Sequence, residues 1–331
     1  MAALSRSQSQ VTAAMNAVEE ARATPSEKAD MLMQIAMGLQ IKPKSVEDLE
    51  AAAHLYRAGL DICPAEEPAL AARIRARMGT ALMATPSQDA EPLLAARAAF
   101  EAALPVLQRE GGAEEVAEAE MNLGLALQNL AGMHKARIQD AIGAYQRALR
   151  IFDKHRHPKE FAILQNNLAS AFMSIPFTDE KSKMREALAV GAFEEGLSVV
   201  NLIDHPAEYA MLQNNLGNAL QYVSSSHPVE NGYRALEAYD EALKVRTASD
   251  TPGEYANTIS NKANCLANLP DDPADPARGN QDNLRAAVEL YREARQIYLA
   301  HGLAEPATIV AAAIQDIEAE LTPEARRVAG R

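Results

Sequence analysis

The stretch HPAEYAMLQNNLGNALQ, residues 205–221, decides the fold because close copies of it recur on both sides. HPKEFAILQNNLASAF (residues 157–172) and TPGEYANTISNKANCL (residues 251–266) share its proline, glutamate, aromatic residue and asparagine at fixed offsets. Three diverged copies come earlier in the chain. The six repeats begin at Pro25, Pro68, Ala113, Pro158, Pro206 and Pro252, which gives spacings of 43, 45, 45, 48 and 46 residues. A period of this length indicates stacked supersecondary elements that bury their apolar faces against one another.

The composition favours helix nearly throughout. Aromatic residues make up 5% of the chain and Trp is absent, while Ala and Leu, both good helix formers, are abundant. A length of 331 residues would by itself suggest about two domains, but the repeat favours one elongated array. We predict an all-α protein with an N-terminal capping helix (residues 1–24), six repeats (25–302), and a C-terminal capping helix with a tail (303–331).

Charge and cysteine usage exclude several classes of function. The formal net charge is −13, which argues against nucleic-acid and anionic-membrane partners because both need a clustered basic surface. Cys63 and Cys265 lie in the first and last repeats, too far apart to pair, and no metal-ligand spacing surrounds either. The chain shows neither a signal-peptide pattern nor an 18-residue apolar run. We therefore expect a cytoplasmic protein without a cofactor or metal.

Each repeat is expected to form two helices. The first opens with Pro in its first turn, and the spacing of Thr251 and Glu254 matches a capping box. Prolines at one common offset, Pro43, Pro86, Pro176 and Pro270, end this helix. Its inward stripe carries a small residue in every repeat: Ala36, Gly79, Gly124, Ala169, Gly217 and Ala263. The second helix carries an aromatic residue that we expect to pack opposite: Tyr56, Phe100, Tyr145, Phe193, Tyr239 and Tyr291.

These motifs resemble the tetratricopeptide repeat. Leu-Gly-x-x-Leu occurs at residues 123–127 and 216–220, and Ala-x-x-x-Tyr follows it in the second helix. The repeats depart from the family because they are about ten residues longer than the usual ~34, lack the opening Trp, and close with Pro only at Pro64. Long loops of this kind are similar to those of bacterial multi-repeat proteins. The resemblance covers about residues 25–300 and implies a right-handed superhelical solenoid whose first helices line a concave groove.

An asparagine-rich row follows from this placement. The position before the inward Leu is Gln34, Arg77, Asn122, Asn167, Asn215 and Asn261 in successive repeats. Neighbouring positions on the same face add Asn166, Asn214, Asn218, Asn257 and Asn264. An Asn amide can pair with both polar groups of a peptide bond. The row resembles the asparagine ladder of the tetratricopeptide half of O-linked GlcNAc transferase and of armadillo-type solenoids, which hold extended peptides. Alternatively, the amides face water or bond to a neighbouring helix and fix the stacking angle.

Arg73 and Arg77 lie one turn apart on the inward face of the second repeat. They are candidates for receiving a carboxylate or another anion, and they resemble part of the carboxylate clamp of chaperone-binding tetratricopeptide proteins. The remaining Lys and Asn positions of that clamp are not matched, so a plain surface pair is the alternative. No Gly-rich phosphate loop, His-Glu-x-x-His motif or nucleophile elbow occurs in the sequence.

Three classes of function fit these observations. The first is a non-enzymatic scaffold, adaptor or dedicated chaperone that holds an extended segment of a partner protein in the Asn-lined groove. The second is a sensor that binds a small peptide or ligand. The third, an enzyme with its site in the long loops, is disfavoured because the loops bring no His, Cys or Ser set together. We expect a protein or peptide partner, and the sequence is also compatible with a homo-oligomer.

Overall fold

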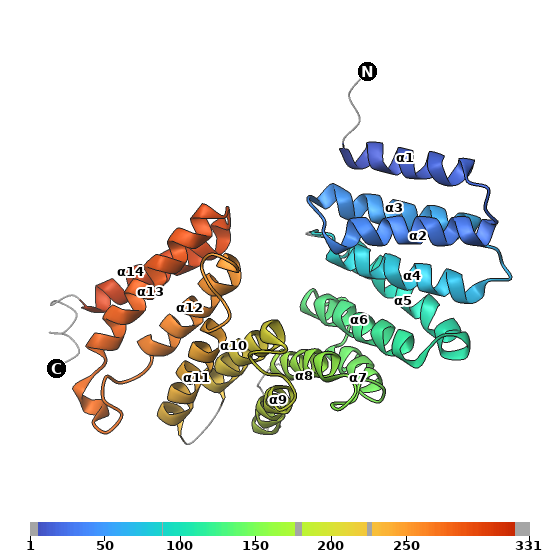
Figure 1. The fold of residues 1–331 in the computed structure, drawn as a ribbon. Helices are drawn as coiled ribbons and strands as arrows, with labels where there is room; N and C mark the ends of the chain where they lie inside the picture. Colours follow the sequence, from blue (N-terminus) through green and yellow to red (C-terminus); the bar gives the residue numbers. More distant parts are fainter. Residues whose placement is uncertain (1–5, 88, 176–180, 224–226, 322–331) are drawn as a thin grey trace. The chain divides into compact units, whose positions relative to one another are not determined.

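The computed structural model describes residues 6–87, 89–175, 181–223 and 227–321, and over these residues the chain is helical with no β-strand (Figure 1). It divides into two compact units, Met1–Asp153 and Lys154–Arg331, called here the N-terminal unit and the C-terminal unit. The repeat spacing did not indicate this division. Each unit holds three helix pairs, and the two units are described separately.

The N-terminal unit contains seven helices in its described residues. They are α1 (Arg6–Glu20), α2 (Pro25–Ile41), α3 (Val46–Ile62), α4 (Pro68–Ala84), α5 (Glu91–Glu110), α6 (Ala113–Gly132) and α7 (Ile138–Ala148). The helix pairs α2/α3, α4/α5 and α6/α7 correspond to the first three repeats, and within each pair the two helices pack along their length. The first helices of these repeats are therefore α2, α4 and α6.

The C-terminal unit continues the same plan over its described residues. Its elements are α8 (Pro158–Met173), α9 (Ser182–Leu197), α10 (Pro206–Tyr222), α11 (Pro228–Leu243), α12 (Pro252–Ala267), the 3₁₀ turn η1 (Pro276–Arg278), α13 (Gln281–Ala300) and α14 (Ala304–Leu321). Here α8, α10 and α12 are the first helices, and α10 packs against both α8 and α12. The six first helices of the chain begin at the six residues that start the repeats in the sequence.

The helix starts use proline more than side-chain caps. Among these helices a complete capping box forms at α2, where Thr24 Oγ1 accepts from the backbone N of Glu27 (3.3 Å) and Glu27 Oε2 accepts from the backbone N of Thr24 (2.7 Å). The box predicted for Thr251 and Glu254 is wrong. Thr251 Oγ1 instead accepts from the backbone N of Thr247 (3.1 Å), because the preceding turn folds back onto it.

The first helices end where the prolines indicate. Helix α2 ends at Ile41 before Pro43, α4 at Ala84 before Pro86, and α12 at Ala267 before Pro270. A residue that precedes proline is pushed out of helical geometry, which accounts for this offset. The predicted stop at Pro176, and the predicted stop and tail after Leu321, lie outside the described residues.

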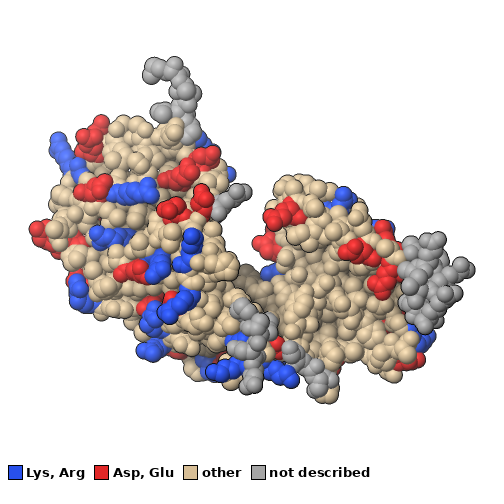
Figure 2. All heavy atoms as spheres, turned by 180° about the vertical axis from the view of Figure 1, so that it is seen from behind, with Lys and Arg blue, Asp and Glu red and all other residues tan. Residues whose placement is uncertain are grey.

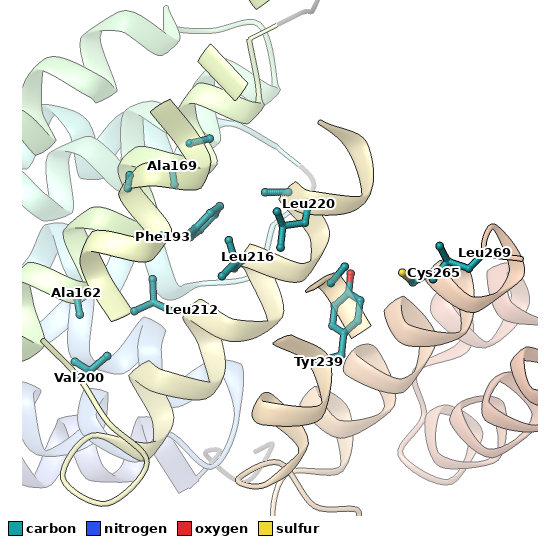
Figure 3. Close-up of a cluster of buried hydrophobic side chains, with 14 residues drawn as sticks. Ala162, Ala169, Phe193, Val200, Leu212, Leu216, Leu220, Tyr239, Cys265 and Leu269 are labelled. Atoms are coloured by element: carbon teal, nitrogen blue, oxygen red, sulfur yellow. The ribbon is translucent and has the colours of Figure 1, made fainter. Parts of the chain in front are cut away.

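Small residues of the first helix do pack against the aromatic residues of the second, as predicted. A Cβ atom added to Gly124 would lie 2.5 Å from the Tyr145 ring, and one added to Gly217 would lie 2.6 Å from the Tyr239 ring. Figure 3 shows Tyr239 in the buried cluster that links α8 to α12 within the C-terminal unit. These contacts are too close for any side chain larger than hydrogen, so the glycines set the distance between the paired helices.

The residue type of the buried aromatic side chain correlates with the residue that faces it on the first helix. Tyr56 Oη donates to Gln40 Oε1 (2.7 Å), and Tyr145 Oη donates to Gln128 Oε1 (2.8 Å). Where the aromatic residue is Phe100 or Phe193, which needs no acceptor, the glutamine position holds Met83 or Met173. The pairing satisfies the buried hydroxyls of Tyr56 and Tyr145, and burial raises the pKa of both tyrosines well above its usual value.

Helices α1 and α14 have the positions expected of capping helices, and their capping role stays a prediction. Helix α1 buries Ala14 and Val18 against α2 and α3, and Ser7 Oγ donates to Asp48 Oδ1 (2.8 Å). Helix α14 buries Val310 and Ile317 against its neighbour α13. Among the described helices, none combines the length and apolarity needed to cross a membrane.

Candidate functional site

A continuous chain of side-chain amides crosses the three first helices of the C-terminal unit. Asn261 Nδ2 donates to Asn214 Oδ1 (3.2 Å), and Asn214 Nδ2 donates to Asn215 Oδ1 (3.0 Å). Asn215 Nδ2 then donates to Asn166 Oδ1 (2.8 Å), and Asn166 Nδ2 donates to Asn167 Oδ1 (3.3 Å). We call these five residues the amide chain. It joins α12 to α10 and α10 to α8, so the structure brings five of the predicted site residues together.

The members of the amide chain differ in exposure. Asn166 and Asn214 are buried, with 6% and 4% of their surface exposed. Asn167, Asn215 and Asn261 are half-buried. Since an amide carries two N–H donors and two acceptor lone pairs, each bond in the chain uses only part of this capacity. Among the described residues the Nδ2 of Asn167 donates no hydrogen bond, so this end of the chain keeps both donors.

Other predicted asparagines form a second network beside the amide chain. Asn264 Nδ2 donates to Gln221 Oε1 (3.0 Å), and Gln221 Nε2 donates to the backbone O of Asn261 (3.2 Å). Asn218 Oδ1 accepts from the buried Tyr239 hydroxyl (2.7 Å). Asn257, which is exposed, accepts from Asn261 Nδ2 (3.3 Å). These bonds fulfil the alternative expectation that the amides connect neighbouring helices, because they hold α10, α11 and α12 in register.

The N-terminal unit carries ion pairs on its first helices. Arg73 forms a bidentate bridge with Glu115 (Nε to Oε1 2.6 Å, Nη2 to Oε2 3.2 Å), which joins α4 to α6. Arg77 bridges Glu118 in the same way (Nη1 to Oε1 2.8 Å, Nη2 to Oε2 3.4 Å). The Arg73 guanidinium holds the pKa of Glu115 below its usual value. Both candidate anion receivers are thus engaged by carboxylates of this chain, and an external anion would have to displace them.

A pocket of about 210 Å³ opens between α2, α4 and α6 beside these ion pairs. Its apolar lining includes Met33, Met37 and Leu107. Gln34 and Asn122, at the repeat position that Asn215 holds in the C-terminal unit, add neutral amides. The structure therefore places Asn122 in this pocket, whereas the other predicted asparagines belong to the C-terminal unit.

Sequence reasoning missed the glutamate partners of the two arginines and the methionines of the pocket. A usable signal existed, because Arg73 and Glu115 are 42 residues apart and Arg77 and Glu118 are 41 apart, close to one repeat length. On the face of the N-terminal unit shown in Figure 2, basic and acidic side chains lie interspersed rather than gathered by sign. No group of His, Cys, Asp and Glu side chains in the described part of the chain is arranged to hold a metal ion.

Comparison with known proteins supports the fold class. No protein-family model matches the sequence, and no curated protein matches it. BtubC (BKLC) from P. vanneervenii is similar in structure over 74% of this chain and 92% of its own, with 21% identity and a TM-score of 0.51.

Two further solved structures give lower scores. One is a Rap protein complexed with Competence and Sporulation Factor (TM-score 0.46, 11% identity, covering 97% of this chain and 88% of that one). The other is a human IFIT1 dimer with m7Gppp-AAAA (TM-score 0.41, 13% identity, covering 95% of this chain and 74% of that one). The chain is an all-α protein of helical repeats that are similar to the tetratricopeptide repeat.

Proposed function

We propose that the protein is a non-enzymatic scaffold that binds an extended segment of a partner protein along α8, α10 and α12. The observation that carries this proposal is the amide chain, in which the half-buried Asn167 and Asn215 keep unused N–H donors. The bonds within the chain fix the orientation of each amide before a partner arrives. Such preorganisation lowers the entropy lost on binding, so more of each new hydrogen bond appears as affinity.

The geometry sets the size of the bound segment. Neighbouring packed helices lie about 8–10 Å apart, so the three first helices span about 16–20 Å. An extended chain advances about 3.3 Å per residue, which corresponds to about five or six residues of the partner. Ile163 and Met211 lie one helical turn before Asn167 and Asn215 and are half-buried, so they offer apolar contacts beside the amides. The amides then read the main chain of the partner, and specificity for its side chains comes from these flanking positions.

The alternative is a sensor for a small ligand. Pockets for drug-sized ligands usually measure about 300–1,000 Å³. The pocket between α2, α4 and α6 is smaller, at about 210 Å³, whereas the pocket beside Gln221 and Asn264 in the C-terminal unit falls within this range, at about 380 Å³. The absence of nucleic-acid binding stays a prediction from the net charge of −13. Fluorescence anisotropy with a single-stranded RNA checks it, and saturable binding at physiological salt would contradict it.

The proposal is tested by finding the partner segment and then changing one amide. A photo-crosslinking residue at position 163, beside Asn167, should capture the partner, whereas the same residue at position 299, which is exposed on α13, should not. Mass spectrometry of the crosslink identifies the segment, which is then synthesised for calorimetry. Capture at position 299 alone would contradict the proposed surface.

The decisive variant is Asn167→Asp. Asn167 only accepts within the amide chain, so an aspartate keeps the bond from Asn166 but removes both free N–H donors and adds a carboxylate. We expect at least a tenfold loss of affinity for the segment with an unchanged melting temperature. Asn129→Asp, at an exposed position of α6, adds the same charge elsewhere and should leave the affinity unchanged. Unchanged affinity in Asn167→Asp would overturn the proposal.

A further inference from the structure

We infer that the pocket between α2, α4 and α6 takes one neutral, apolar side chain of a partner segment. The inference deepens the proposed function and rests on it, because it names a second contact that a partner would make. The pocket holds about 210 Å³, which is too small for most ligands of drug size. A single buried side chain that fills a pocket is the usual anchor of a protein interface.

Small residues of the second and third repeats, Ala76 and Ala119, leave the space of the pocket. Ala76 lines it at the repeat position where the preceding repeat has Met33 and the following repeat has Met121. Truncation to Ala at this position leaves space that the longer side chains fill elsewhere. Met33 and Met37 border this space, and their unbranched, polarizable side chains adapt to apolar groups of different shape.

The charges around the pocket exclude a charged occupant. Its four charged lining residues, Arg73, Arg77, Glu115 and Glu118, form two mutual ion pairs, so their sum is zero. An entering carboxylate would compete with Glu115 or Glu118, and an entering ammonium group would compete with the arginines. Either ion would also lose its hydration without gaining a free partner. A neutral apolar group loses nothing comparable and gains contacts with the methionines and Leu107.

Blocked amino acids are direct probes of this pocket. The full-length protein, labelled with ¹³C at its methionine methyl groups, is titrated with the N-acetyl amides of leucine, glycine, lysine and glutamate. Substitution of Met33 and Met37 by leucine, one at a time, assigns their signals. We expect saturable shifts of both signals with the leucine compound, and binding at least about tenfold weaker for the glycine, lysine and glutamate compounds.

The matched variant is Ala76→Met, which restores the residue of both neighbouring repeats and should fold. It should occupy the space beside Met33 that the leucine side chain needs and abolish the shifts caused by the leucine compound. Ser260→Met makes the same replacement at the same repeat position in the C-terminal unit and should leave these shifts unchanged. The inference is overturned if the charged compounds bind as well as the leucine compound, if no compound gives saturable shifts, or if Ala76→Met still binds. None of these results depends on the amide chain, so a failure here is distinguishable from a failure of the proposed function.

Discussion

The two units differ in the polar bonds that join their first helices. Ion pairs join repeats in both units, as Lys159 and Glu208 do between α8 and α10, but among the described residues the amide chain belongs to the C-terminal unit alone. In the N-terminal unit, ion pairs of half-exposed side chains join α4 to α6, with 43% of the Arg73 side chain and 36% of the Glu115 side chain exposed. In the C-terminal unit, neutral amides join α8, α10 and α12, and two of the five are buried. Exposed ion pairs contribute little and are screened by salt, whereas a buried amide that loses its partner is costly. The stacking of the C-terminal unit should therefore depend more on its polar bonds than that of the N-terminal unit.

The largest effect should come from the packing that both units share. Gly124→Leu and Gly217→Leu should each destabilise the protein by about 3 kcal/mol or more, because even a Cβ atom meets a buried tyrosine ring. Urea unfolding monitored by circular dichroism measures this. Gly191→Leu, where a Cβ meets nothing within 4 Å, is the control and should be neutral or stabilising. If only one of these two glycine substitutions were destabilising, the packing within helix pairs would differ between the two units. A difference in stability between the units could then not be assigned to the bonds between repeats.

An intermediate effect should separate the two kinds of coupling. Asn215→Ala removes the acceptor of Asn214 and the donor to Asn166, both of which are buried. We expect a loss of about 1–3 kcal/mol in the free energy of unfolding. Arg77→Ala removes a pair whose side chains are 40% and 41% exposed, and should cost about 0.2–1 kcal/mol. Thermal and urea unfolding measure both variants. Equal losses of unfolding free energy in Asn215→Ala and Arg77→Ala would contradict the distinction between the units.

The smallest effect should be a difference in pH dependence. The pKa of Glu115 is lowered in the folded protein, chiefly by its hydrogen bond from Arg73. Its ion pair therefore stabilises the fold above the unfolded-state pKa of about 4.3 and loses this contribution as the pH falls through the folded-state pKa. Glu115→Gln should lower the melting temperature slightly at pH 7, and the difference from the wild type should shrink towards pH 3.5. Asn215→Ala should show a loss that does not shrink in this way, because amides do not titrate.

Much of the fold follows from periodicity in the sequence. The six first-helix starts, the helix ends before Pro43 and Pro270, and the contact of Gly217 with Tyr239 all depend on spacing within one repeat. A pattern of small and aromatic residues that recurs in every copy carries that information directly. Competition between local hydrogen-bond partners is harder to predict from the sequence. Thr251 Oγ1 accepts from the backbone N of Thr247 in the preceding turn and does not form the predicted capping box.

Contacts between repeats were harder to predict. Whether Asn215 faces a ligand or Asn166 depends on how far successive first helices are rotated and shifted, and the repeat length alone does not determine this. The same holds for Arg73. In the next repeat, Glu118 occupies the repeat position of Arg73, but Arg73 pairs with Glu115, about one helical turn earlier. The sequence therefore identified the residue types on the inward face but not their partners.

Side-chain amide NMR of the C-terminal unit within the full-length protein tests most directly whether the amide chain binds the partner segment. We expect the half-buried Asn215 to show one slowly and one rapidly exchanging Nδ2 proton in the free protein, since one of its N–H groups is bonded and the other is not. Both protons of Asn167 should exchange rapidly. Adding the captured partner segment should slow the exchange of the Asn167 protons. If the Nδ2 protons of Asn167 and Asn215 are all protected in the free protein, or if the exchange of the Asn167 protons does not change when the segment binds, the amide chain only connects the helices and is not the binding surface.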